Sequence, residues 1–235
     1  MRINMINLFF RKRRKSENAL APSIIKIIGV GNGGINVINH LQTHGFKEDS
    51  LWACDMDGSV IERAVATHCL LLGQTGLGSG NNSELAREEA KKRIGEIRSM
   101  IDKGHPEVIF VVTCLGGECG TAVSPIIAEE SRKMGIKTIG VVTLPFEFEG
   151  NHKFNHATAG LAELAKNTDA MFVLNNQYLL NHHSRESVIT AFSKANELMR
   201  TVVCSIIDFI NADYGKKAGN GLIGYLKKRF NRMFI

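Results

Sequence analysis

The stretch SIIKIIGVGNGGINVINHLQTHG, residues 23–45, joins a strand to a helix through a run of glycines. Its first part is a continuous apolar run typical of a buried strand, and its second part has the apolar spacing of a helix that ends at Gly45. Between them, Gly29, Gly31 and Gly34 fit the pattern G-x-G-x-x-G, in which the start of a helix faces a phosphate group. The stretch therefore predicts an α/β fold that binds a nucleotide.

Strands and helices alternate along the rest of the chain. Such alternation is typical of a Rossmann-type parallel sheet with helices on both faces, in which ligands bind at the carboxyl ends of the strands. Apolar runs predict further strands at 50–57, 69–73, 108–113, 136–145 and 170–175. Apolar spacing predicts a helix that runs to about Thr67 and further helices at 84–104, 121–134, 153–166 and 184–210.

A second glycine-rich loop, CLGGECGTAVSP (114–125), follows the strand at 108–113 and opens a helix. Two sets of backbone N–H groups at helix starts suit a nucleoside triphosphate that is bound from both sides. Asp55 and Asp57 leave an alternative open, because an acid about 20 residues after the first loop binds the ribose in NAD-dependent enzymes. An NAD-dependent oxidoreductase is therefore the rival prediction.

The charge is distributed unevenly along the chain. Residues 1–15 and 216–235 hold 12 of the 29 Lys and Arg residues and no acid, so residues 16–215 carry 17 basic against 23 acidic residues. An acidic body with basic ends does not suit nucleic acid, and it favours an anionic surface that only the ends contact. The five cysteines form no CxxC pair, which favours buried thiols in a reducing compartment.

Both ends combine apolar and basic residues. The sequence has no apolar run long enough to span a membrane, and INMINLFF precedes RKRRK, the reverse of a secretory signal, so a cytoplasmic protein is expected. The segment GLIGYLKKRFNRMFI (221–235) predicts a basic amphipathic helix that lies on an anionic membrane or, alternatively, packs on the sheet. The candidate membrane or partner residues are Phe9, Phe10, Arg11, Lys12, Arg13, Arg14, Lys15, Leu222, Leu226, Lys227, Lys228, Arg229, Phe230 and Met233.

From Ile24 to Ile210, a series of segments in a fixed order resembles FtsZ, the bacterial and archaeal relative of tubulin. The segments are GVGNGGINVINHL, DMDGSV, GLGSGNN, GGECGTA, VVTLPFEFEG, TDAMFVLNNQYLL and AFSKANELM. The resemblance implies a GTP-binding domain of the tubulin/FtsZ fold that ends after a central long helix, with GTP or GDP as ligand. The implied nucleotide-binding residues are Gly31, Asn32, Gly33, Gly34, Asn36, Asp57, Gly78, Gly80, Gly116, Gly117, Glu118, Cys119, Gly120, Thr121, Glu149, Lys153, Asn175, Phe192, Asn196 and Glu197.

The residue types at the end of this series suit guanine. The base presents N–H donors on one edge, for which the Asn196 amide and the Glu197 carboxylate are partners. Phe192, one helical turn earlier, can stack on the base. Glu149 can accept hydrogen bonds from ribose, and Lys153 stands where the family has Arg, so it keeps the charge but loses the bidentate fork.

The second loop departs from the family signature GGGTGTG at Glu118, Cys119 and Ala122. A carboxylate 5 Å from a phosphate charge costs about 3 kcal/mol at an effective dielectric of 20, and a positive φ at position 118 would add about 1–2 kcal/mol of strain. Glu118 is therefore expected to alter the affinity for phosphate or to hold a cation such as Mg²⁺. The sequence predicts no other metal site. His152 and His156 are four residues apart, but the sequence offers no third ligand for them.

The resemblance stops after the central helix. We expect a tail at 1–22, the GTP-binding domain at 23–211, and a linker with the basic segment at 212–235, with the family's second, activation domain absent. Asp208 and Asp213 are only weak candidates for the catalytic acids of that family. The predicted function is a membrane- or filament-associated guanine-nucleotide-binding protein of cell division or cytoskeletal organisation, with weak or partner-dependent hydrolysis and with itself or an FtsZ-like protein as partner. A self-assembling GTPase, an NAD enzyme and a nucleotide-free interaction protein remain as alternatives.

Overall fold

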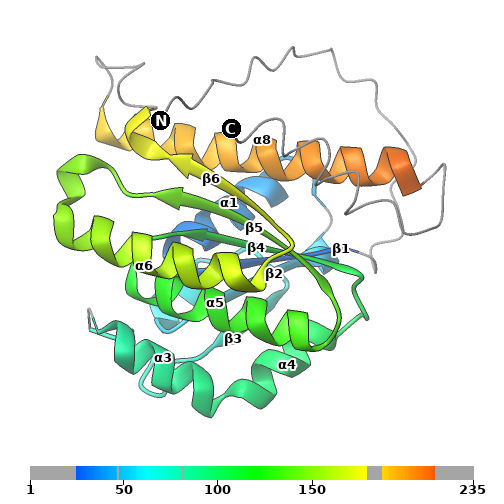
Figure 1. Ribbon diagram of the computed structural model, residues 1–235, viewed down its shortest axis with the longest axis horizontal. Coiled ribbons are helices and arrows are strands. Elements are labelled where there is room, and N and C mark those ends of the chain that lie inside the picture. The colour runs from blue at the N-terminus through cyan, green and yellow to red at the C-terminus, as the bar shows by residue number, and fades with distance from the viewer. Residues whose placement is uncertain (1–24, 47, 81, 179–186, 215–235) are drawn as a thin grey trace. The chain divides into compact units, whose positions relative to one another are not determined.

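The computed structural model describes residues 25–46, 48–80, 82–178 and 187–214 (Figure 1). One sheet of six parallel strands lies at the centre of the fold, in the order β3-β2-β1-β4-β5-β6. This arrangement confirms the predicted α/β class with a Rossmann-type parallel sheet. The strands are β1 (Ile25–Val30), β2 (Leu51–Asp55), β3 (His68–Leu71), β4 (Val108–Cys114), β5 (Lys137–Leu144) and β6 (Ala170–Asn175).

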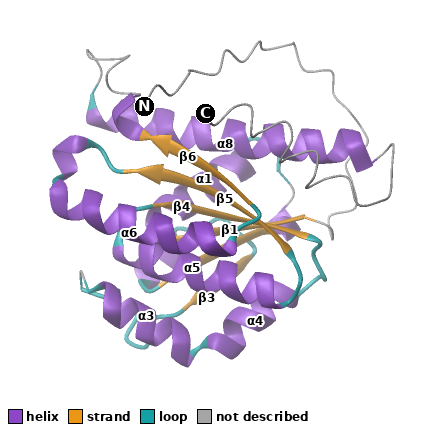
Figure 2. Cartoon of the chain, in the orientation of Figure 1, coloured by secondary structure: helices purple, strands orange, loops and turns teal. Residues whose placement is uncertain are grey.

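Helices cover both faces of the sheet, as Figure 2 shows. Helices α3, α4, α5 and α6 pack side by side on one face, and α1 and α2 lie together on the other. The helices are α1 (Gly31–Thr43), α2 (Gly58–Glu62), α3 (Ser83–Lys92), α4 (Ile94–Asp102), α5 (Glu118–Lys133), α6 (Asn151–Asn167) and α8 (Val188–Tyr214), with 3-10 turns at Glu48–Ser50 and Glu147–Glu149.

The core lies on both sides of the central strand β1, all six residues of which are buried. Ile28 and Val30 point into the cluster formed with α3 to α6. Gly29 packs against α1 so closely that a Cβ atom there would collide with Ile38. Burial on both faces explains why this strand reads as a continuous apolar run and not as an alternating one.

Two predicted helices are wrong in their extent. The helix expected to reach Thr67 ends at Glu62, because the Asn39 side chain of α1 binds the following turn through Arg63 O (3.0 Å) and Val65 N (2.9 Å). The helix expected at 84–104 is two helices, which break at Arg93. There the guanidinium donates to Leu71 O (3.0 Å), and φ and ψ are −101° and 26°.

The start of α5 also differs from the prediction. It begins at Glu118 instead of residue 121, after an extended Gly117 at the N-cap. The glycine-rich loop is therefore shorter than expected, and its signature residues already belong to the first turn of the helix.

Residues 22–203 form one compact unit, and helix α8 crosses its boundary at Cys204. Ala191, Ala195, Met199 and Val203 are buried at four-residue intervals, which gives the first part of α8 one buried stripe. No helix in the described ranges is both long enough and apolar enough to cross a membrane. The candidate membrane residues at positions 9–15 and 222–233 lie outside the described residues.

Candidate functional site

A cavity of about 750 Å³ opens at the carboxyl ends of the strands. Fifteen of the twenty predicted nucleotide-binding residues line it, although they come from segments spread between positions 31 and 196. Residues that far apart in the sequence meet at one cavity because the fold brings their loops together. They are Gly31, Asn32, Gly33, Asn36, Asp57, Gly78, Gly80, Gly117, Glu118, Cys119, Gly120, Glu149, Lys153, Phe192 and Asn196.

Two helix N-termini meet at the floor of this cavity. Helix α1 begins at Gly31, and a Cβ atom on Gly31 would lie 2.9 Å from Gly120 N in the first turn of α5. Gly31 has a φ of +75°, which L-residues rarely adopt. The N-cap residues, Val30 and Gly117, form no side-chain cap hydrogen bond. Backbone N–H groups of both helices, with the positive ends of both helix dipoles, are therefore directed at the same space, which suits an anion.

Three of the predicted residues shape these loops without lining the cavity. The Thr121 hydroxyl accepts a hydrogen bond from Gly116 N (2.8 Å), and Gly116 has a φ of +104°. Gly34 packs so closely on Val112 O that no side chain fits between them. Gly34, Gly116 and Thr121 thus hold the two glycine-rich loops in place.

Glu118 lies in the first turn of α5 and lines the cavity. Glu118 does not have the positive φ that would strain its backbone, because His105 is the one non-glycine residue with a positive φ in the described ranges. The Glu118 carboxylate lies 3.5 Å from His156 Nε2 of α6, and its side chain is 15% exposed. Glu118 therefore places a carboxylate beside the N-terminus of α5, with the His156 ring as its neighbour.

Cys119 stands where the FtsZ signature has a threonine, and its thiol bonds to a carboxylate of the protein itself. Its thiol is a partner of the Asp55 carboxylate, which also accepts from Met56 N (2.6 Å) and Asp57 N (3.0 Å). Burial raises the pKa of Cys119 well above its ordinary value, and the charge of Asp55 raises it further. Burial likewise raises the pKa of Asp55. A thiol that stays protonated is a poor nucleophile, so Cys119 is suited to packing and hydrogen bonding and not to redox chemistry.

The side chains expected around the base and the ribose, Phe192, Glu149 and Lys153, line another part of the cavity. Phe192 is 41% exposed, and its ring meets the edge of the buried Phe146 with 5.0 Å between the ring centroids. Glu149 accepts from Phe146 N (2.9 Å) and lies 3.2 Å from Lys153 Nζ. An exposed aromatic face next to these charged groups can receive a base and a sugar.

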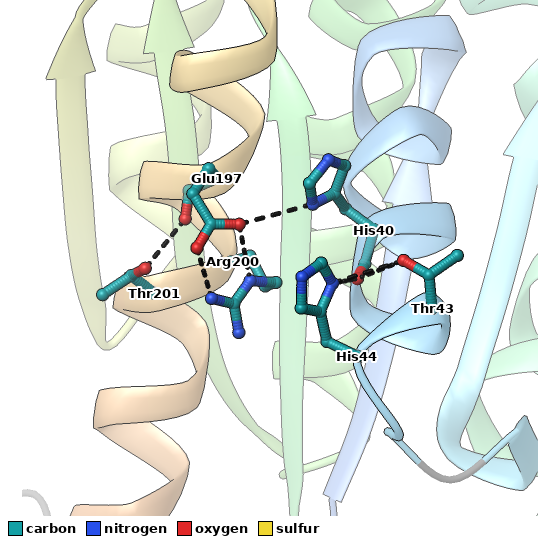
Figure 3. Close-up of polar contacts among 6 residues, drawn as sticks. All are labelled: His40, Thr43, His44, Glu197, Arg200 and Thr201. Carbon is teal, nitrogen blue, oxygen red and sulfur yellow. Dashed lines mark hydrogen bonds and ion pairs between the residues drawn. The ribbon is translucent and has the colours of Figure 1, made fainter. Parts of the chain in front are cut away.

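Two predicted residues point elsewhere. Asn175 accepts from Gln177 N (3.0 Å) and does not line the cavity. The Glu197 carboxylate is bound by the Arg200 guanidinium through both oxygens and faces His40 of α1 (Figure 3). Asp208 is an exposed residue of α8, and the side chain of Asp213 lies outside the described part of the chain.

The cavity also contains residues that the sequence did not suggest. Asn176 is 3% exposed, lines the cavity and leaves its Oδ1 atom without a hydrogen-bond partner in the described structure. Arg63 and Thr143 line it as well. Asn175 is the last residue of β6 and Asn176 begins the helical turn that follows; of the two, only Asn176 lines the cavity. Arg63 follows α2 and had no sequence signal beyond its charge.

A family model described as Tubulin/FtsZ family, GTPase domain, matches residues 24–184. Cell division protein FtsZ of Porphyromonas gingivalis is 36% identical over 192 residues, which cover 80% of this chain and 42% of that protein. Cell division protein FtsZ 1 of Thermococcus kodakarensis is 35% identical over 189 residues, which cover 79% of this chain and 50% of that protein. The chain thus spans about half the length of the curated relatives it matches.

Solved structures agree with this assignment. The FtsZ dimer of M. jannaschii superposes with a TM-score of 0.75 at 32% identity, over 80% of this chain and 55% of that one. CetZ2 from Haloferax volcanii, solved as a GTPγS-bound protofilament, gives a TM-score of 0.70 at 23% identity over 78% of this chain and 58% of that one, a likeness of fold alone. From the family match over residues 24–184, the identity to FtsZ proteins and the shared fold, we conclude that the chain belongs to the Tubulin/FtsZ family.

Proposed function

We propose that the cavity binds GTP or GDP, with the phosphates at the paired N-termini of α1 and α5 and the base against Phe192 and Asn196. The observation that carries the proposal is the gathering of fifteen predicted nucleotide-binding residues around one cavity of about 750 Å³. Its charged and polar lining suits a ligand with an anionic end and a planar polar end.

Guanine is the base that these residues favour. The Asn196 amide can pair with the donor and acceptor groups along its edge, and Phe192 offers an aromatic surface one helical turn away. Glu197 can reach the base only by leaving Arg200. The rival NAD site is less well supported, because the family match is to the Tubulin/FtsZ GTPase domain and because the second glycine-rich loop, at the start of α5, lines the same cavity as the first.

The residues present also fit a hydrated Mg²⁺ ion that accompanies the phosphates. Mg²⁺ prefers oxygen ligands and keeps several of its waters, so it needs only one or two protein groups beside the nucleotide. The Glu118 carboxylate and the unpartnered Asn176 Oδ1 are oxygen donors that line the cavity. Glu118 would hold such an ion and would lose its repulsion of the phosphates in doing so.

Hydrolysis is proposed to be weak or dependent on a partner, in a role in cell division or cytoskeletal organisation at the cytoplasmic face of a membrane. Self-association is the second candidate, supported by the 32% identical relative that was solved as a dimer. It predicts that phosphate release per chain rises with protein concentration and falls when Asp208, exposed on α8, is replaced by Asn. A rate at the buffer background throughout the series would exclude self-activated hydrolysis.

A pair of phenylalanines provides the test of nucleotide binding. Phe192 and Phe154 are both 41% exposed, but only Phe192 lines the cavity. Loss of a stacked base costs about 1–3 kcal/mol, so Phe192→Ala should weaken mant-GDP binding about 5- to 100-fold. Phe154→Ala should bind as the wild type does. Equal affinity of both variants and the wild type would show that the base does not stack on Phe192.

A further inference from the structure

Away from the cavity, helices α1 and α8 bring two imidazoles and a carboxylate together. His40 lies in the last turn of α1, His44 is its C-cap residue, and Glu197 lies on α8. The ligand atoms of the three side chains all lie within 4.8 Å of one another. Figure 3 shows both rings between the two helices, on the side of α1 that faces Glu197.

We propose that His40, His44 and Glu197 form a site for a divalent transition-metal ion of the zinc class. Two histidines at i and i+4, with a carboxylate from a second element, are a ligand set that such ions favour. Ligands at 2.0–2.1 Å in a tetrahedral site lie about 3.4 Å apart. The distance between His40 Nδ1 and Glu197 Oε2 is 3.4 Å.

The hydrogen bonds of the histidines leave suitable nitrogen atoms for a metal. His44 Nδ1 lies 2.7 Å from His40 O, to which it donates, so its Nε2 atom is left as the ligand. This arrangement, in which the second ring nitrogen binds a backbone carbonyl, is the usual support of a metal-bound histidine. His40 Nδ1 is shielded from solvent and has no hydrogen-bond partner in the described structure, apart from its contact with Glu197.

Arg200 orients the carboxylate without blocking the site. Its Nε atom donates to Glu197 Oε2 (2.8 Å) and its Nη2 atom to Oε1. These two hydrogen bonds fix the plane of the carboxylate between α8 and α1. A carboxylate oxygen has two lone pairs, so Oε2 can accept from Arg200 and still bind a metal. Binding of the ion would draw the three ligand atoms, now within 4.8 Å of one another, to about 3.4 Å, and water would be the fourth ligand.

The test is a titration of the full chain, freed of metal with a chelator, with ZnCl₂ in a calorimeter. One Zn²⁺ ion per chain should bind, and the single replacements His40→Ala and His44→Ala should each weaken that binding at least 10-fold. Glu197→Gln, which keeps the volume of the side chain, should also weaken it about 10-fold or more. Substitution with Co²⁺ should give the intense visible absorption of a tetrahedral complex in the wild type and lose it in the His44 variant.

His152→Ala is the control, because His152 is an exposed residue of α6 outside the cluster. Its affinity for Zn²⁺ should equal that of the wild type. Circular dichroism and the melting temperature without metal would show that each variant is folded. Folded His40 and His44 variants that bind Zn²⁺ as tightly as the wild type would overturn the proposal. So would a wild type that binds no Zn²⁺ at concentrations on the order of 100 μM.

Discussion

Glu118 places a negative charge in the first turn of α5, where the phosphates of a nucleotide are proposed to lie. Without Mg²⁺, Glu118→Gln should bind GDP at least 10-fold more tightly, because a unit charge 5 Å away costs about 3 kcal/mol at an effective dielectric of 20. With Mg²⁺ the gain should shrink, since the carboxylate then has a cation to hold. Titration of mant-GDP in EDTA and in Mg²⁺ measures both.

A matched carboxylate is available on the same helix. Glu129 lies on α5, is paired with Lys133 at 2.7 Å and does not line the cavity. Glu129→Gln should leave both affinities unchanged. If Glu118→Gln in EDTA bound GDP no more tightly than this control, the proposed position of the phosphates would be wrong.

The backbone conformation of Gly31 leads to a prediction about stability. Its φ of +75° and the 2.9 Å approach of a Cβ atom to Gly120 N should make Gly31→Ala less stable by at least about 1–2 kcal/mol. Gly95 of α4 is the opposite case, because nothing lies within 4 Å of an added Cβ atom. Gly95→Ala should gain about 0.5 kcal/mol from higher helix propensity. Urea unfolding of both variants checks this; equal stabilities would contradict the close approach of the two loops.

Single residues also mark the limit of what the sequence predicts. The glycines were found because a glycine pattern between a strand and a helix has a local cause. The direction of a side chain has no such local cause: β6 ends at Asn175, and the sequence does not show that Asn176, the next residue, is the one that lines the cavity. Glu197 turns toward Arg200 and His40 because of contacts on two helices, which no local pattern contains.

Among the elements, the wrong predictions are of helix ends that depend on a distant contact. Arg93 interrupts a strongly helical segment because its side chain binds Leu71 O of β3. Helix α2 ends early because the Asn39 side chain of α1 binds the turn that follows it. The types of the elements were predicted well because apolar periodicity reports burial on the sheet. The ends of the elements depend on tertiary hydrogen bonds between residues that are 22 to 26 positions apart in the sequence.

An ion-pair cluster joins α4 to α5. Glu130 is 3% exposed and accepts from Arg98 Nε (2.6 Å) and Lys133 Nζ (2.8 Å). Burial raises the pKa of Glu130, but these hydrogen bonds outweigh it, and the pKa lies below the ordinary 4.5. The stabilisation is therefore complete above pH 4.5 and is lost as the pH falls through the folded-state pKa.

Replacement of Glu130 should expose this dependence. Glu130→Gln should lower the free energy of unfolding by about 1.5 kcal/mol at pH 7, and the difference from the wild type should shrink below pH 4.5. Urea unfolding across pH 3–7 measures it, with Glu129→Gln, a more exposed neighbour, as the control. A difference that stays constant with pH would mean that the charge of Glu130 does not contribute.

For the whole molecule, the order of the strands brings the loops after β1, β2 and β4 to one edge, and a single cavity forms there. The sequence predicted this gathering because parallel strands place their carboxyl ends together. The proposal that this ligand is a guanine nucleotide came from the resemblance to FtsZ. The family match covers residues 24–184, so the proposals for both ends of the chain rest on their composition alone.

The basic ends predict attachment to an anionic surface. A chain without residues 1–15 and 216–235 lacks 12 of the 29 basic residues and should no longer sediment with vesicles that contain anionic lipid. The full chain should sediment with them at low salt and less at high salt, and it should leave neutral vesicles unbound. Equal sedimentation of the full and the shortened chains would assign the contact to the body of the protein.

Calorimetric titration of the full chain with GDP and GTP in Mg²⁺, beside ATP and NADH, tests the central claim most directly. The account predicts one GDP or GTP per chain with a dissociation constant in the micromolar range or below, and at least 10-fold weaker binding of ATP and NADH. A chain that binds no guanine nucleotide, or that binds NADH more tightly, would contradict it.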